Sequence, residues 1–245
     1  RAENGKLTDA GNSMSPDIER VMSLNPDAIL LSPFENAGYG RIGKMGIPII
    51  ECADYLETSP LGRAEWIKFF GLLYGKEVEA DSIFTEVEKN YTELRNKIGI
   101  LSSAPVVISE LKSGSAWYMP GGKSYMARFF KDAGAAYPWS DNPETGSIPL
   151  SFETVFNWAG EADIWLIKSF NVSELSYRTL QKEYAPYARF KAFREKKIYG
   201  CDSSRCNYYE ETPFRPDLLL QELAALFHPG LFPDYRFRYY QPLSE

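Results

Sequence analysis

Two patterns of apolar residues alternate along the chain. Short continuous apolar runs occur at residues 28–31 and 47–50, and other segments carry apolar positions that recur every three or four residues. Continuous short runs are typical of buried parallel strands, and the longer spacing is typical of amphipathic helices. The alternation predicts an α/β fold. Further strands are expected at residues 106–108, 163–167 and 198–199. Helices are expected at residues 16–24, 40–46, 60–73, 77–98, 124–133, 152–159, 175–184 and 216–227.

The segment from residue 77 to residue 98 predicts the longest helix. Its apolar positions keep the three-or-four spacing throughout, and a helix of this length would measure about 33 Å at the usual rise per residue. So long an element suggests a strut between two lobes. We therefore expect two three-layer α/β lobes joined by a long backbone helix. The expected divisions are an N-terminal lobe at 1–59, a linking helical segment at 60–103 and a C-terminal lobe at 104–245.

Composition narrows the classes of protein that this chain can represent. With 44 % hydrophobic residues among 245, the chain has enough apolar material for a packed core. Its formal net charge of −6 argues against nucleic-acid binding, which needs clustered Lys and Arg. The sequence contains no run of about eighteen apolar residues, which is the length that a membrane-spanning helix needs. The chain starts at Arg1 without an initiator Met, so an export signal or lipid anchor removed upstream is compatible with it.

The three cysteines predict no zinc site. Cys52, Cys201 and Cys206 form no CxxC pair, and the chain has one histidine, His228. Cys201 and Cys206 bracket the short polar loop 202–205. In an oxidising compartment they could form a disulfide, and otherwise they would be two partly buried thiols.

Several segments, taken in order, resemble a known family. They are MSPDIE (14–19), LNPDAIL (24–30), the long helix, MPGGKS (119–124), LSFE (150–153) and ADIWL (162–166). Their order and spacing resemble the helix-linked periplasmic binding proteins for ferric siderophores, haem and vitamin B12. Family members begin with a strand, a helix and a second strand ahead of the helix at 16–24. We therefore expect a first lobe that is truncated at its N-terminus, built differently, or completed by exchange with a second chain.

The resemblance also implies two docking residues. In this family one glutamate on each lobe pairs with arginine pockets of the membrane permease, and the matching positions are Glu19 and Glu153. A simpler interpretation stands beside this one. Both residues lie in the first turn of an expected helix, where the helix dipole favours a carboxylate.

A ligand site is expected where the strands end, because open α/β sheets bind ligands at the carboxyl ends of their strands. In the first lobe this rule selects Phe34 and Glu35 among others. An aromatic set with a few cations would suit the broad, partly apolar and negatively charged face of a metal chelate. Each aromatic residue could equally be ordinary core packing. The expected ligand-binding residues are Tyr39, Tyr55, Trp117, Tyr118, Met119, Lys168, Arg205, Tyr208 and Tyr209.

The expected function is transport and not catalysis, because no nucleophile elbow, zinc-protease helix or paired-carboxylate motif is present. We expect a monomeric substrate-binding protein of an ABC importer, periplasmic or lipid-anchored, that needs no cofactor and passes a ferric siderophore to a permease dimer. Cobalamin and haem are alternative ligands. His228 is interpreted as structural, which leaves tyrosine as a haem ligand. Alternatives from other classes are a receptor module without transport and a two-lobed metallocluster-type enzyme.

Overall fold

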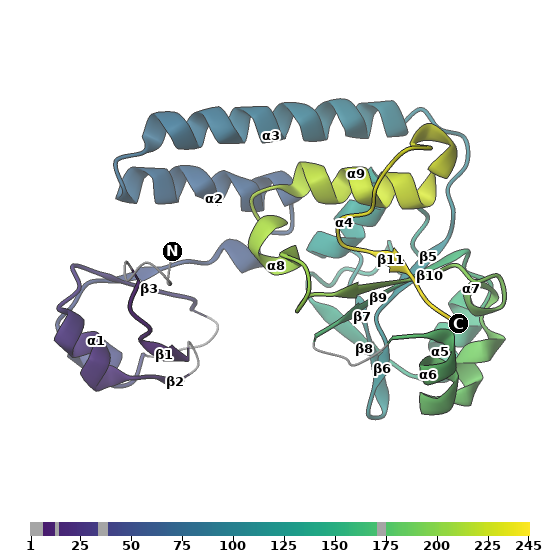
Figure 1. Ribbon diagram of the computed structural model, residues 1–245, viewed down its shortest axis with the longest axis horizontal. Helices are drawn as coiled ribbons and strands as arrows, with labels where there is room; N and C mark the ends of the chain where they lie inside the picture. Colours follow the sequence, from purple (N-terminus) through teal and green to yellow (C-terminus); the bar gives the residue numbers. More distant parts are fainter. Residues whose placement is uncertain (1–6, 13–14, 34–38, 171–174) are drawn as a thin grey trace. The chain divides into compact units, whose positions relative to one another are not determined.

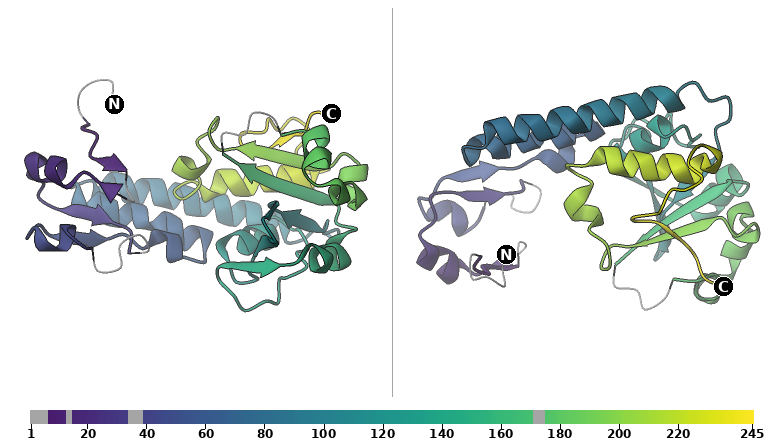
Figure 2. Two further views of the ribbon diagram at one scale, coloured as in Figure 1. Left: turned by 90° about the horizontal axis from the view of Figure 1, so that it is seen from below. Right: turned by 45° about the horizontal axis from the view of Figure 1, so that its top comes forward.

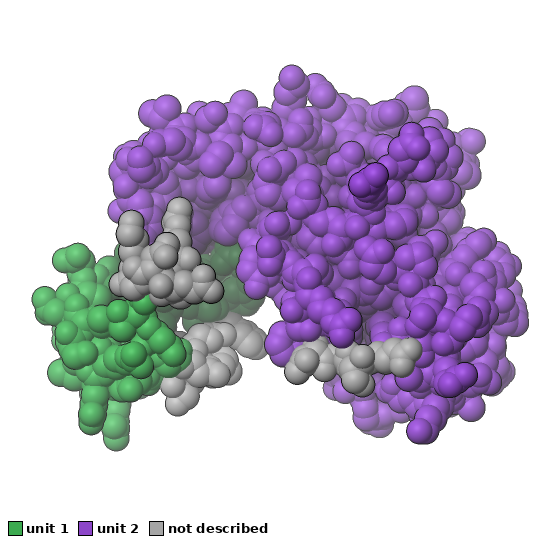
Figure 3. Space-filling view, viewed as in Figure 1, with its two compact units in different colours: residues 1–56 green, residues 57–245 purple. Residues whose placement is uncertain are grey.

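The computed structural model describes residues 7–12, 15–33, 39–170 and 175–245. The chain divides into two compact units, residues 1–56 and residues 57–245 (Figures 1 and 3). The long helix predicted at residues 77–98 lies in the second unit, where it packs on two other helices. Each unit combines helices and strands, so the mixed α/β class predicted from the apolar pattern is confirmed.

The first unit contains a parallel strand pair, with Ile29 opposite Ile49. Helix α1 is capped at its N-terminus by Asp17, whose side chain accepts a hydrogen bond from the backbone N–H of Arg20. The helix expected at 40–46 is only a single 3-10 turn, because Gly40 and Gly46 both take a positive φ that ends helical geometry. The elements are β1 (Gly11–Asn12), β2 (Ser15–Pro16), α1 (Ile18–Leu24), β3 (Ile29–Leu31), η2 (Ile42–Lys44), β4 (Ile49–Glu51) and η3 (Asp54–Leu56).

Two sheets form the centre of the second unit. The first has the order β11-β10-β9-β5, in which β10, β9 and β5 are parallel and β11 is an antiparallel edge strand. The second is antiparallel, with the order β6-β7-β8, and the sequence patterns did not predict it. The strands are β5 (Val107–Ser109), β6 (Lys112–Ser113), β7 (Ala116–Pro120), β8 (Ser147–Leu150), β9 (Ile164–Ser169), β10 (Ile198–Asp202) and β11 (Gln241–Pro242).

Three helices of the second unit, α2, α3 and α9, lie side by side (Figures 1 and 2). The close approach of α2 to α3 depends on Gly71, where an added Cβ would lie 2.4 Å from the Cβ of Ala80. None of the described helices has the length and apolar character needed to cross a membrane. The helices are α2 (Pro60–Leu73), α3 (Glu77–Ile98), α4 (Tyr125–Asp132), α5 (Phe152–Ala159), α6 (Tyr177–Glu183), α7 (Lys191–Arg194), α8 (Tyr208–Glu211) and α9 (Pro216–Phe227), with 3-10 turns η4 (Ala185–Arg189) and η5 (Pro229–Leu231).

Aromatic side chains form much of the core between the two sheets. The ring of Trp165 lies 5.4 Å from that of Trp117, 5.2 Å from that of Tyr187 and 5.3 Å from that of Phe190. All four side chains are buried. Tilted and edge-on aromatic contacts at these distances add to the stabilisation that burial provides. This core holds the carboxyl ends of β5 and β9 in fixed positions.

Candidate functional site

A cavity of about 670 Å³ lies in the second unit, at the carboxyl ends of β5 and β9. The turn from β5 to β6 forms one part of its lining, and β7 and the start of α4 form another. Parallel strands commonly present their binding residues at this end of a sheet. The cavity therefore lies where the sequence placed the ligand site of this part of the chain.

An ion pair lies in this cavity. Lys168, near the end of β9, bonds through Nζ to a carboxylate oxygen of Glu110, which directly follows β5. The two side chains are only 15 % and 24 % exposed. Burial by itself lowers the pKa of Lys168, but the charge of Glu110 and its hydrogen bond outweigh that effect and raise the pKa. Lys168 thus stays protonated and paired.

The backbone of Glu110 takes an uncommon conformation, with a φ of 65° in the left-handed region. Its N–H donates to the carbonyl oxygen of Leu166 at 2.8 Å, and its own carbonyl accepts from Nε1 of Trp165 at 2.8 Å. Because Trp165 belongs to the buried aromatic cluster, the core holds this strained residue in place. Strained backbone of this kind is concentrated at functional sites.

Two tyrosines, Tyr118 and Tyr125, line the same cavity as the ion pair. Tyr118 is 50 % exposed on β7, and Tyr125 at the start of α4 donates its hydroxyl to the carbonyl of Thr212 at 3.2 Å. The guanidinium of Arg63 lies 5.4 Å from the centre of the Tyr125 ring. Tyr209, on α8, is exposed and contributes to the raised pKa of Lys168. The cavity can therefore offer ring faces and a fixed charge pair to a ligand.

Three of the expected ligand contacts are corrected by their burial. Trp117 and Met119 are fully buried, since side chains alternate along β7 and only Tyr118 between them points outward. The Nε1 of Trp117 donates to the carbonyl of Ser109 at 3.0 Å. Tyr208 is also buried, with its hydroxyl 3.6 Å from the sulfur of Met126. These three side chains stabilise the core and have no free surface for a ligand.

Two expected contacts belong to the first unit. Tyr39 donates its hydroxyl to the carboxylate of Glu51, and that hydrogen bond, with a smaller contribution from desolvation, raises the pKa of Tyr39 to about 12. Tyr55 lies in η3. Phe34 and Glu35 fall outside the described residues. A role in binding stays a prediction for all four.

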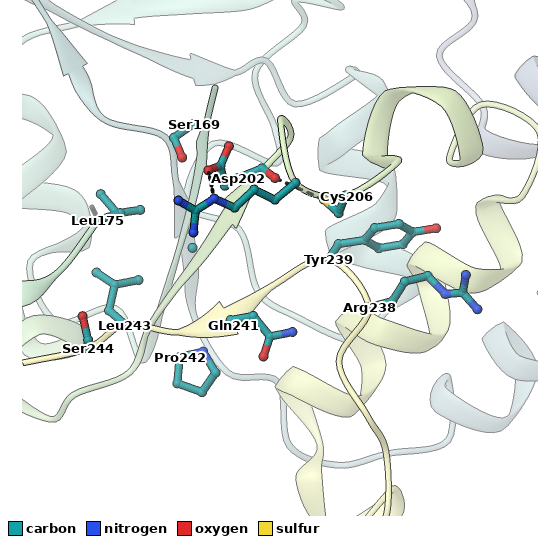
Figure 4. A pocket seen from close by; sticks show the side chains of 12 residues that line it. Ser169, Leu175, Asp202, Cys206, Arg238, Tyr239, Gln241, Pro242, Leu243 and Ser244 are labelled. Carbon is teal, nitrogen blue, oxygen red and sulfur yellow. Dashed lines mark hydrogen bonds and ion pairs between the residues drawn. The ribbon is translucent and has the colours of Figure 1, made fainter. Parts of the chain in front are cut away.

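Arg205 lines a second cavity, of about 450 Å³, beside β10 and β11 (Figure 4). Its Nε lies 3.3 Å from a carboxylate oxygen of Asp202, and its side chain is 75 % exposed. Figure 4 shows Asp202 and Ser169 near one another and Leu243 and Ser244 further along the same pocket. The sequence grouped Arg205 with Lys168 and Tyr118, whereas the structure assigns it to the lining of a separate cavity.

The two cysteines for which a disulfide or two thiols were both open, Cys201 and Cys206, lie close together as free thiols. Their sulfur atoms are 3.7 Å apart, and Cys201 is buried while Cys206 is partly exposed. Burial, and next the neighbouring Cys206, raise the pKa of Cys201. A disulfide needs a sulfur separation of about 2 Å, so a small movement would join them.

We expect oxidised glutathione to convert Cys201 and Cys206 into a disulfide. Each thiol loses one hydrogen, and the glutathione disulfide takes up both as it is reduced to two thiols. Titration of the unfolded protein should then find one free thiol in place of three. Cys52→Ser should still form the bridge and Cys206→Ser should not. Three free thiols after exposure would contradict the expectation.

The two expected docking residues are exposed. Glu19 lies in the first turn of α1 and Glu153 in the first turn of α5. Ser151 caps α5 by accepting a hydrogen bond from the backbone N–H of Thr154 at 3.1 Å. Within the described parts of the chain, neither carboxylate has an ion-pair partner. Docking onto a permease stays a prediction for both.

Comparison with known proteins identifies the family. The model of the periplasmic binding protein family matches residues 1–204, and the chain belongs to that family. It is 31 % identical over 239 residues to an uncharacterized lipoprotein of Methanocaldococcus jannaschii, covering 93 % of this chain. The chain spans about half the length of that relative, 54 %. The family comprises solute-binding proteins and not enzymes, as the sequence predicted.

Solved structures of periplasmic binding proteins share the fold. The chain is similar to IsdE of S. aureus, solved in complex with haem, with a TM-score of 0.70 and 19 % identity. That match covers 93 % of this chain and 87 % of the other. It is also similar to a possible iron-binding (periplasmic solute-binding) protein of Staphylococcus epidermidis, with a TM-score of 0.69, 18 % identity and coverage of 89 % and 82 %. The resemblance to periplasmic binding proteins that the sequence segments indicated is confirmed.

Sequence reasoning missed Glu110. No motif marks it, although its position immediately after a buried strand was an available signal. The ring of His228, by contrast, is structural, as predicted. It is buried with Nε2 3.1 Å from the carbonyl oxygen of Ala133, at the end of α4.

Proposed function

We propose that the chain is the substrate-binding component of an ABC-type importer, and that it captures an iron chelate outside the cytoplasm and delivers it to a permease. The observation that carries the proposal is the cavity at the carboxyl ends of β5 and β9, in a member of the periplasmic binding protein family. Its tyrosine rings and charged pair match a ligand with a broad face and polar edges.

A ferric siderophore is the first candidate ligand, and haem and cobalamin are the alternatives. The similarity to a haem-bound structure and to a possible iron-binding protein supports this group of ligands. Haem would need an axial ligand from the protein. Because the His228 ring is buried against Ala133, the better candidates among the described residues of this unit are two exposed tyrosines, Tyr118 in the cavity and Tyr209 on α8.

Delivery of the ligand to the permease would use the exposed carboxylates of Glu19 and Glu153. A carboxylate can accept two parallel hydrogen bonds from the planar guanidinium group of an arginine. A monomer that presents one carboxylate from each unit could orient itself on a permease dimer. The similarity to an archaeal lipoprotein supports a location outside the cytoplasm, either periplasmic or lipid-anchored.

Ligand titration tests the proposal. The panel is a ferric hydroxamate, a ferric catecholate, haemin and cyanocobalamin, followed by quenching of the five tryptophans and by calorimetry. We expect saturable, sub-micromolar binding of one ligand class. Tyr118→Ala should weaken that binding by about tenfold, since an aromatic contact of about 1 kcal/mol and its buried area are lost.

Tyr74→Ala is the matched control, because Tyr74 is an exposed tyrosine at the end of α2 and outside the cavity. It should leave the affinity unchanged. If folded protein binds no member of the panel, the chelate-import proposal is wrong, and a receptor module without transport becomes the better hypothesis.

A further inference from the structure

The cations expected to attract a negatively charged chelate are already paired. Lys168 bonds to Glu110, and Arg205 lies 3.3 Å from Asp202. A paired cation attracts an incoming anion weakly, because the carboxylate beside it repels that anion over a similar distance.

The charges that line the cavity at β5 and β9 cancel. They are the carboxylates of Glu110 and Glu183 and the ammonium groups of Lys112 and Lys168. Lys112 also makes local contacts, since its Nζ donates to the carbonyl of Gly114 and lies 5.2 Å from the centre of the Tyr184 ring. The cavity therefore presents tyrosine surface around a neutral set of charges.

The backbone of Glu110 is held beside Lys168. Both backbone polar groups of Glu110 are bonded, one to Leu166 and the other to buried Trp165. Its φ of 65° sets the direction in which the Cα–Cβ bond leaves the backbone. The carboxylate itself is held by its ion pair with the Nζ of Lys168, so its negative charge lies within the cavity.

Resting on the proposed function, we propose that this cavity selects an iron chelate of low net charge, and that Glu110 sets the selection by holding Lys168. Three hydroxamates around Fe³⁺ give a neutral centre, whereas three dianionic catecholates leave three negative charges. The tris-catecholate would meet the fixed carboxylate of Glu110 without an unpaired cation at Lys168 to balance it. Like charges placed together in a binding site oppose the wrong ligand.

The experiment compares the affinities of a neutral ferric trihydroxamate and a ferric tris-catecholate, measured by calorimetry on the full chain. We expect the trihydroxamate to bind at least about tenfold more tightly. Glu110→Gln removes the charge and keeps the shape, which releases Lys168 to attract an anion. The ratio of the two affinities should then shift toward the tris-catecholate by at least about tenfold, and added salt should reduce that shift.

Glu161→Gln is the matched control, because Glu161 is an exposed, ion-paired glutamate away from the cavity. It should leave the ratio unchanged, and the melting temperatures of both variants show whether each is folded. Tris-catecholate binding by the unaltered protein as tight as that of the trihydroxamate would overturn the charge selection and leave the import proposal intact. An unchanged ratio in folded Glu110→Gln would overturn the role of Glu110. Binding of neither chelate would count against the import proposal itself.

Discussion

Glu222→Gln is expected to lower the free energy of unfolding by about 3 kcal/mol, because two buried and two partly buried donors lose a charged acceptor at once. The Glu222 side chain is 0 % exposed. Its carboxylate accepts from the backbone N–H groups of Arg238 at 2.5 Å, Tyr239 at 2.8 Å and Tyr240 at 2.6 Å, and from the Tyr235 hydroxyl at 3.2 Å. Glutamine would point an NH₂ group at donors that need an acceptor.

Urea denaturation measures this effect as a lower midpoint with an unchanged slope. Glu210→Gln is the control, because Glu210 is exposed on α8, and it should change stability by less than about 0.5 kcal/mol. Equal midpoints for the two variants would mean that the carboxylate of Glu222 does not fix the C-terminal segment on α9. The segment matters for the core, since Tyr239 and Tyr240 pack against the ring of Tyr208 at 5.5 Å and 6.2 Å.

Gly122→Ala should destabilise the protein by about 3 kcal/mol through overpacking against backbone that cannot move aside. A Cβ at Gly122 would lie 2.4 Å from the carbonyl oxygen of Trp139 and 2.5 Å from those of Ser140 and Asn142. These contacts are far shorter than van der Waals separation. The variant should therefore melt at a lower temperature in calorimetry, by several degrees.

Gly146→Ala is the matched control, since a Cβ there would meet nothing within 4 Å. It should change stability by less than about 1 kcal/mol. If both alanine variants lose the same stability, the close backbone approach at Gly122 is not the cause. A selective loss at Gly122 would show that the turn before α4 supports the wall of the cavity at Ser124 and Tyr125.

Elements with a strong apolar pattern were predictable. Helices α2, α3, α5 and α9 have the bounds that their spacing indicated, because their apolar positions recur at helical spacing over several turns. The three-stranded antiparallel sheet was not predictable. Its strand β8 is short and contains Pro149, and β7 was not among the expected strands although Trp117, Tyr118 and Met119 alternate inward and outward.

The candidate site was predictable in position and less so in composition. Lys168 and Tyr118 line the cavity, although each lies within a strand, β9 or β7, and not in a loop that follows one. Residue type alone could not separate exposed Tyr118 from buried Trp117 and Tyr208, because an aromatic side chain suits a core and a ligand equally well.

The sequence by itself determined the α/β class, the long helix, the family and the end of the sheet at which a ligand site should lie. Those features depend on local periodicity and on short segments in order, which a linear pattern records. Only the tertiary structure decided the charge of the site, because Glu110 and Lys168 are 58 residues apart and meet through the pairing of β5 with β9. The left-handed backbone of Glu110, whose carbonyl accepts a hydrogen bond from buried Trp165, leaves no periodic pattern in the sequence. The pairing of the Glu110 carboxylate with Lys168 could therefore be found only from the tertiary structure.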